Sequence, residues 1–181
     1  REALIMGGPF KIILVGGDEQ VANDLISYLR HLENLWTRFS PDSEIMQLNW
    51  AQGRSVVVSE ETTTLVSQMV SAYELTNGMF DPTTLPQTLL NGYQVSRVDS
   101  TRTTRLPQTA RWPGDVAGIR VDVINRTVTL PEGTTLDAGG IGKGLSADLG
   151  IEFAFSRGVT GALISANGDV RVAGDAPDGE L

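Results

Sequence analysis

The segment LDAGGIGKGLSADLG, from Leu136 to Gly150, places four glycines and one lysine between two aspartates. A glycine-rich bend followed by an apolar pattern predicts a strand-to-helix turn, with a helix that begins near Gly142. Free N–H groups and the positive end of the helix dipole suit a phosphate there, and Lys143 adds a full positive charge. The alternative is a plain turn with a solvated lysine, and the segment alone favours neither.

Two common phosphate motifs do not fit this segment. A Walker A loop would need glycine at 137 and serine or threonine at 144, where the chain has Asp137 and Gly144. A Rossmann fingerprint starting at Gly140 would need glycine at 145, where the chain has Leu145. The bend is therefore neither an ordinary P-loop nor a dinucleotide fingerprint.

Composition limits the possible chemistry. The 181 residues are 40% hydrophobic and carry a net charge of −8, which argues against a broad nucleic-acid surface but not against one small anionic ligand. The chain has no cysteine and one histidine, so a bound metal would be a hard cation held by oxygens. No apolar run reaches the ~20 residues of a membrane helix, and no leader precedes the first strand, although a leader could have been removed.

Hydrophobic periodicity predicts alternating strands and helices. A buried strand is expected at Phe10–Gly16, then a helix capped by Asp18 with an apolar face extending to Phe39. Residues 94–118 are polar and punctuated by proline, which is typical of an ordered loop or insertion. The pattern as a whole favours an α/β or α+β fold. The other expected elements are a helix capped by Ser59, a hairpin around Asn125-Arg126, a helix after Gly142, and two strands between 159 and 174.

Five ordered segments together resemble the ApbE family, the FAD:protein FMN transferases. DAGGIGKGLSAD is similar to the family signature D-x-G-G-I-x-K-G-x-x-x-D, and ISANGDVRVAG is similar to its N-x-G-G-D-I-R segment. The other three are Met6-Gly7-Gly8, FSPDSEIMQLN at Phe39–Asn49 and TNGMFDPTTLP at Thr76–Pro86. The resemblance implies an α+β, T-fold-like architecture with mostly antiparallel sheets and helices packed on them, in a single domain over residues 1–181.

The resemblance also implies an activity. Members of this family cleave the pyrophosphate of FAD and transfer FMN to a threonine of an acceptor protein, with release of AMP and with help from Mg²⁺. The expected partners are FAD and an acceptor protein with a threonine motif. Family members usually work outside the cytoplasm or anchored to a membrane. The sequence does not give the acceptor, the compartment or the oligomeric state.

Site residues follow from positions that match the family motifs, and no catalytic residue is assigned. Gly140 would offer its backbone carbonyl to Mg²⁺. Phe39 and Phe80 could equally be core aromatics, and Asp81 could initiate a turn. The residues expected to contact FAD are Met6, Phe39, Met79, Phe80, Asp81, Asp137 and Lys143.

Relatives are expected to continue beyond this chain with further Mg²⁺ ligands. We therefore expect the 181 residues to be part of a longer protein and inactive alone. Two alternatives use the same scaffold, namely an FAD pyrophosphatase, in which water replaces threonine, and a flavin-binding protein without catalysis. A structural domain without a ligand is the fourth possibility.

Overall fold

The computed structural model describes residues 1–177, and the chain divides into two compact units. Unit 1 is made of Arg1–Glu33 and Gly142–Leu181, and unit 2 is made of Asn34–Ile141. Helices pack with two sheets, and every strand pairing among the described residues is antiparallel. The expected α+β class is confirmed, whereas the single domain over residues 1–181 stays a prediction.

Unit 1 is built on a four-stranded sheet in the order β1-β2-β6-β7. Two tight turns connect its hairpins, Met6-Gly7 and Asn167-Gly168, and all four residues have positive φ. Turns of this hand match the twist of the strands they join. The strands are β1 Glu2–Ile5, β2 Gly8–Val15, β6 Gly161–Ala166 and β7 Asp169–Gly174.

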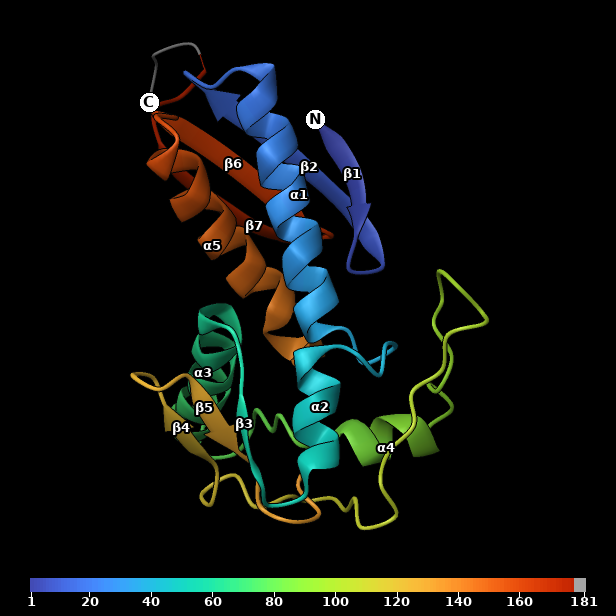
Figure 1. Ribbon diagram of the computed structural model, residues 1–181. Helices are drawn as coiled ribbons and strands as arrows, with labels where there is room; N and C mark the ends of the chain where they lie inside the picture. Colours follow the sequence, from blue (N-terminus) through green and yellow to red (C-terminus); the bar gives the residue numbers. More distant parts are fainter. Residues whose placement is uncertain (178–181) are drawn as a thin grey trace. The chain divides into compact units, whose positions relative to one another are not determined.

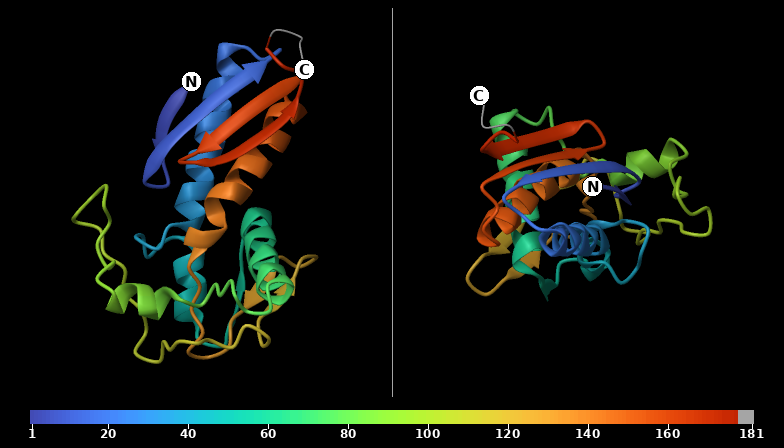
Figure 2. Two further views of the ribbon diagram at one scale, coloured as in Figure 1. Left: turned by 180° about the vertical axis from the view of Figure 1, so that it is seen from behind. Right: turned by 90° about the horizontal axis from the view of Figure 1, so that it is seen from above.

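Helices α1 (Glu19–Trp36) and α5 (Gly142–Ser156) cover one face of this sheet (Figures 1 and 2). Close packing needs the glycine at 150, because a Cβ there would lie 2.7 Å from Ile164 Cδ1 and 3.2 Å from Leu29 Cδ2. Asp18 caps α1, as predicted, since its carboxylate accepts from the Val21 N–H at 2.9 Å. The sequence placed Phe39 on the apolar face of this helix, but α1 ends at Trp36.

Unit 2 combines a small sheet, in the order β3-β5-β4, with short helices. Ser43 and Ser59 cap α2 and α3 through their hydroxyls, and the second cap was predicted. Among the residues described, no helix is both long and apolar enough to span a membrane. The elements are α2 Glu44–Ala51, β3 Ser55–Val57, α3 Glu60–Leu75, α4 Leu85–Leu90, β4 Arg120–Asp122, β5 Thr127–Thr129 and the 3₁₀ turn η1 Ala138–Gly140.

The polar segment 94–118 contains one isolated β-bridge, between Val95 and Thr103. Helix α4 was not predicted. Pro86 occupies the first turn of α4, where its missing N–H costs nothing.

Candidate functional site

A buried asparagine positions the glycine-rich segment in unit 2. Asn49, the last residue of the motif Phe39–Asn49, donates its amide to the Leu136 carbonyl at 3.0 Å and accepts from the Leu136 N–H at 2.8 Å. Both residues are fully buried. The side chain of Asn49 therefore replaces a strand partner for Leu136 and fixes the backbone immediately before Asp137.

Asp137 lies where two distant motifs meet. Its carboxylate caps η1 by accepting from the Gly139 N–H at 3.0 Å. Its own N–H donates to the Pro82 carbonyl at 3.0 Å, which ties the glycine-rich segment to the F-D-P motif. The carboxylate also faces Arg38, whose Nε is 3.7 Å from Asp137 Oδ2.

Phe80 and Gly140 are in close contact within unit 2. A Cβ at position 140 would lie 2.8 Å from Phe80 Cε2, so the ring needs the absence of a side chain there. The Phe80 N–H is held by the Thr76 hydroxyl at 2.9 Å. Phe80 is half-buried, so part of its ring surface stays open to solvent.

Arg38 connects the cluster and was not singled out from the sequence. Its guanidinium lies 4.2 Å over the ring of Phe39 and pairs with Asp137. Burial lowers the pKa of Arg38, and the charge of Asp137 partly opposes that shift. An arginine stays charged even so, and it therefore supplies a fixed cation beside the Phe39 ring.

Asp81 is engaged by its own unit. One carboxylate oxygen accepts from the N–H and the hydroxyl of Thr83, at 2.8 and 2.6 Å. The other oxygen accepts from Trp112 Nε1 at 2.9 Å. These bonds match the turn alternative for Asp81, and its contact with FAD stays a prediction. Trp112 is itself half-exposed.

Unit 2 thus brings together four of the expected nucleotide contacts, namely Phe39, Phe80, Asp81 and Asp137, together with Gly140. Met79 belongs to the same unit, and its side chain is 92% exposed. Met6 and Lys143 belong to unit 1. Met6 opens the β1–β2 turn and donates its N–H to Glu33 at 2.8 Å, and Lys143 lies in the first turn of α5. The contacts of these seven residues with FAD stay predictions.

The residues fit a metal cage poorly. Within residues 1–177, no three Asp, Glu or His side chains gather closely enough to hold a cation. The only ligand that the sequence assigned is the carbonyl of Gly140, and Mg²⁺ in proteins normally needs at least one carboxylate. The described part of the chain does not by itself fit a protein-built Mg²⁺ site.

Comparison with known proteins gives the family. The ApbE family model matches residues 6–181. The chain belongs to the ApbE family. It is 28% identical over 177 residues to the FAD:protein FMN transferase of Klebsiella pneumoniae (strain 342). That match covers 96% of this chain but 55% of the relative, so the chain spans little more than half the length of this ApbE protein.

Solved ApbE structures share the fold. The flavin transferase ApbE of Vibrio cholerae superposes with a TM-score of 0.79 at 18% identity, covering 99% of this chain and 60% of that one. The apo flavinyl transferase ApbE of Pseudomonas stutzeri gives 0.80 at 20% identity, covering 99% and 59%. The ApbE protein of Thermotoga maritima gives 0.78 at 22% identity, covering 97% and 59%. The expected ApbE-like architecture is confirmed.

Proposed function

We propose that the protein transfers FMN from FAD to a threonine hydroxyl of an acceptor protein, with release of AMP. The observation that supports this most is the convergence, inside unit 2, of three family motifs that are far apart in the sequence. Asn49 bonds to Leu136 immediately before Asp137, the Asp137 N–H bonds to the Pro82 carbonyl, and Phe80 packs on Gly140. The name of the Klebsiella relative supports FMN transfer from FAD to a protein, while the threonine acceptor and the release of AMP rest on the family resemblance.

The transfer exchanges one phosphorus–oxygen bond for another. The threonine oxygen forms a bond to the phosphorus on the FMN side of the pyrophosphate, and the bond from that phosphorus to the bridging oxygen breaks. AMP leaves with the bridging oxygen, and the hydroxyl proton passes to a base that this chain does not identify. The negative charge that develops on the phosphates calls for cations and backbone N–H groups.

Two aromatic residues of unit 2 suit an isoalloxazine ring. Phe39 already carries the Arg38 guanidinium on one face, and Phe80 keeps part of its surface open. Aromatic rings pair with offset or edge-to-face geometry and gain about 0.5–1.5 kcal/mol beyond burial. In the proposal, these two rings contact the flavin; the contact of Lys143, in unit 1, with phosphate is a separate expectation from the family motif. Magnesium enters the proposal only through the resemblance. If Mg²⁺ binds, the FAD phosphates and water would have to supply most of its ligands.

Two measurements test the proposal. Titration of FAD into the 181-residue chain, followed by flavin fluorescence, tests binding. Incubation of the natural full-length protein with FAD, Mg²⁺ and a threonine-motif peptide tests transfer. A peptide heavier by one FMN unit supports the transferase, whereas free FMN and AMP with unmodified peptide would indicate the pyrophosphatase. Binding without any AMP release would leave a flavin-binding protein. Addition of EDTA to the same reaction tests the magnesium requirement.

A further inference from the structure

A hairpin-like excursion of unit 2 lies beside the cluster around Asp137. We name residues 93–105 the arginine hairpin. The bridge between Val95 and Thr103 closes it, and the Thr104 N–H donates to the Gln94 carbonyl at 2.9 Å. The Ser96 N–H donates to the Arg102 carbonyl at 3.0 Å. These bonds hold the excursion in one conformation, which lowers the entropy lost on binding.

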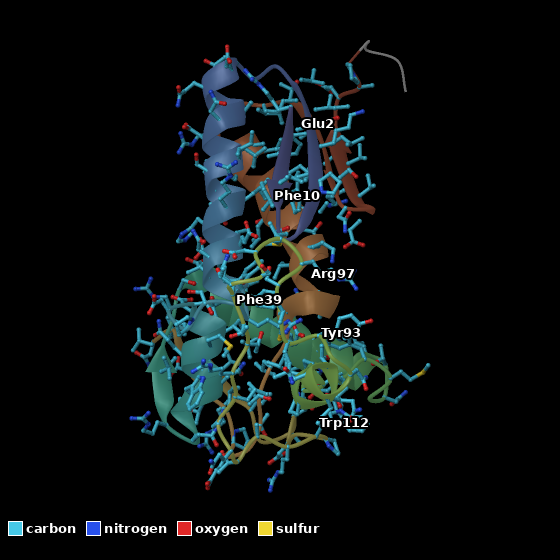
Figure 3. All side chains as sticks on the ribbon, turned by 90° about the vertical axis from the view of Figure 1, so that its right-hand side faces the viewer. Glu2, Phe10, Phe39, Tyr93, Arg97 and Trp112 are labelled. Carbon is cyan, nitrogen blue, oxygen red and sulfur yellow. The ribbon has the colours of Figure 1, made fainter. Side chains whose placement is uncertain are left out.

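The arginine hairpin is attached to the residues beside the candidate flavin site. Arg38 donates to the Tyr93 carbonyl at 2.8 Å and to the Thr104 hydroxyl at 2.9 Å, so it holds both ends of the hairpin. Arg102 Nε donates to the Phe39 carbonyl at 3.3 Å. A molecule bound to the hairpin would therefore lie next to the Arg38-Phe39 dipeptide. Figure 3 shows Tyr93 and Arg97 on the hairpin, with Phe39 on the neighbouring segment.

The charge of this region is opposite to that of the chain. Residues 82–114 contain four arginines and one aspartate, which is a net charge of +3. The whole chain carries −8, so the residues outside this range together carry −11. Within the described residues none of these arginines forms an ion pair. The one acidic residue, Asp99, accepts hydrogen bonds from the N–H and the hydroxyl of Thr101. Arg102 donates to the Phe39 carbonyl, so the charges of Arg97 and Arg105 are the ones most available to a partner.

Apolar surface lies among these charges. Tyr93 is 49% exposed and Val98 is 69% exposed, and the Arg97 guanidinium lies 5.6 Å from the Tyr93 ring centroid. Tyrosine and arginine are enriched at protein–protein interfaces, where the aromatic ring supplies contact area and the guanidinium pairs with carboxylates.

We propose that the arginine hairpin docks an acidic, extended segment of the acceptor protein and so delivers its threonine to the flavin site. The part of this proposal that makes the partner an acceptor of FMN rests on the proposed function. The binding of an acidic peptide to the hairpin does not. Complementary charge raises the association rate and rejects partners with basic flanks. The hairpin thereby selects acceptors by the charge around the modified threonine.

Fluorescence anisotropy with two labelled peptides tests the proposal on the 181-residue chain. One peptide alternates glutamate with valine around a single threonine, and the other has lysine in place of each glutamate. We expect the acidic peptide to bind more tightly than the lysine peptide, and we expect its affinity to fall as the salt concentration rises. The variant R97E/R105E should bind it at least about tenfold more weakly, a loss of ~1.4 kcal/mol.

A matched control carries the same change of charge elsewhere. Arg30 and Arg120 are exposed and lie outside the hairpin, so R30E/R120E lowers the net charge equally. We expect its peptide affinity to stay within about twofold of the parent, since distant exposed charges are screened by salt. Equal losses in the two variants would overturn the proposal, because they would show a response to net charge alone.

Other occupants give different outcomes. Vesicles of phosphatidylcholine with phosphatidylserine test an anionic lipid surface, and Arg97-dependent vesicle binding without peptide binding would overturn the proposal. So would a fall in FAD affinity in R97E/R105E, because the arginines would then serve the nucleotide. Peptide binding that persists in a chain unable to bind FAD would support the hairpin and count against the transferase. FAD binding without peptide binding would overturn the hairpin proposal and leave the proposed transferase function standing.

Discussion

Arg38 and Asp137 form an ion pair that joins two segments almost a hundred residues apart, with 3.7 Å between Arg38 Nε and Asp137 Oδ2. The side chains are 14% and 18% exposed, so the pair is largely shielded from water. The same guanidinium lies on the ring of Phe39 and holds both ends of the arginine hairpin. One arginine therefore links the glycine-rich segment, the candidate flavin contact and the proposed docking element.

Substitution of Arg38 by methionine should destabilise unit 2 and loosen the hairpin. The change keeps most of the apolar stem but removes the ion pair and two hydrogen bonds, and it leaves Asp137 without its cation. We expect the free energy of unfolding to fall by about 1–3 kcal/mol, measured by urea denaturation. Arg30→Met is the control, because Arg30 is exposed, and its effect should stay within about 0.5 kcal/mol. Equal effects would show that Arg38 acts only as a surface charge.

Asn49→Ala should be one of the most destabilising polar substitutions in the chain. It would leave both the N–H and the carbonyl of Leu136 buried and unpaired, at a cost of about 2–4 kcal/mol in unfolding free energy. Gln47→Ala, on the same helix α2, removes an exposed amide that bonds to the Asp42 carbonyl and should cost less than about 0.5 kcal/mol. Thermal or urea unfolding distinguishes them, and a mild Asn49→Ala phenotype would mean that water replaces the amide.

Two glycines of the opening segment should respond to alanine in opposite directions. Gly140→Ala places a methyl group 2.8 Å from Phe80 Cε2 and should displace that ring, lowering FAD affinity if Phe80 contacts the flavin. A Cβ at Gly144 meets nothing within 4 Å, so Gly144→Ala should stabilise helix α5 by up to about 1 kcal/mol. Flavin titration and thermal unfolding of both variants give the comparison. Unchanged FAD affinity in Gly140→Ala would remove the Phe80 ring from the proposed site.

Local signals in the sequence predicted a large part of the fold. The caps Asp18 and Ser59 each accept from an N–H three residues further along the chain, and the turn at Asn167-Gly168 needs only residues that tolerate positive φ. Such features depend on a few consecutive residues, so a single sequence reveals them. Helix α4 was missed, because a proline in the first turn of a helix is compatible with a helix start as well as with the end of the helix before it.

The contacts that assemble the site could not be predicted in the same way. Asn49 bonds to Leu136 and Arg38 pairs with Asp137, and neither partnership leaves a periodic or local pattern. Asn49 had one signal, as the last residue of a recognised motif, but that motif did not say what the amide binds. The only sequence signal for Arg38 was its position next to Phe39. Long-range polar contacts depend on how elements pack, which one sequence does not specify.

Acidification should open the tip of the arginine hairpin. Hydrogen bonds from the Thr101 hydroxyl and N–H lower the pKa of Asp99. Because the folded pKa lies below the unfolded one, the carboxylate stabilises the tip above the unfolded value, and this contribution is lost as pH falls through the folded pKa. The Thr101 amide resonance should therefore titrate with a midpoint below the ordinary ~3.9 of aspartate.

Thr101→Val is the matched control for this titration, since it removes the hydroxyl and keeps the shape. The midpoint, followed on the Asp99 carboxyl carbon by NMR, should move upward toward the ordinary value. A midpoint that does not move would show that the hydroxyl bond contributes nothing to the charge state of Asp99.

Lys143→Ala should weaken FAD binding without weakening the fold. Lys143 lies in the first turn of α5, and no described carboxylate forms an ion pair with it, so its charge is available to a phosphate. A charge-assisted bond to phosphate contributes about 1.5–3 kcal/mol, which corresponds to a roughly 10- to 150-fold rise in Kd for FAD. The chain has one other lysine, Lys11, which is exposed on β2 of the same unit.

Lys11→Ala therefore removes the same charge and should leave the Kd within about twofold. A titration with FMN separates the parts of the ligand, because FMN has one phosphate and no pyrophosphate bridge. If Lys143 serves the bridge, Lys143→Ala should lower FAD affinity more than FMN affinity. Equal small losses in both lysine variants would assign the effect to net charge and leave α5 without a role in nucleotide binding.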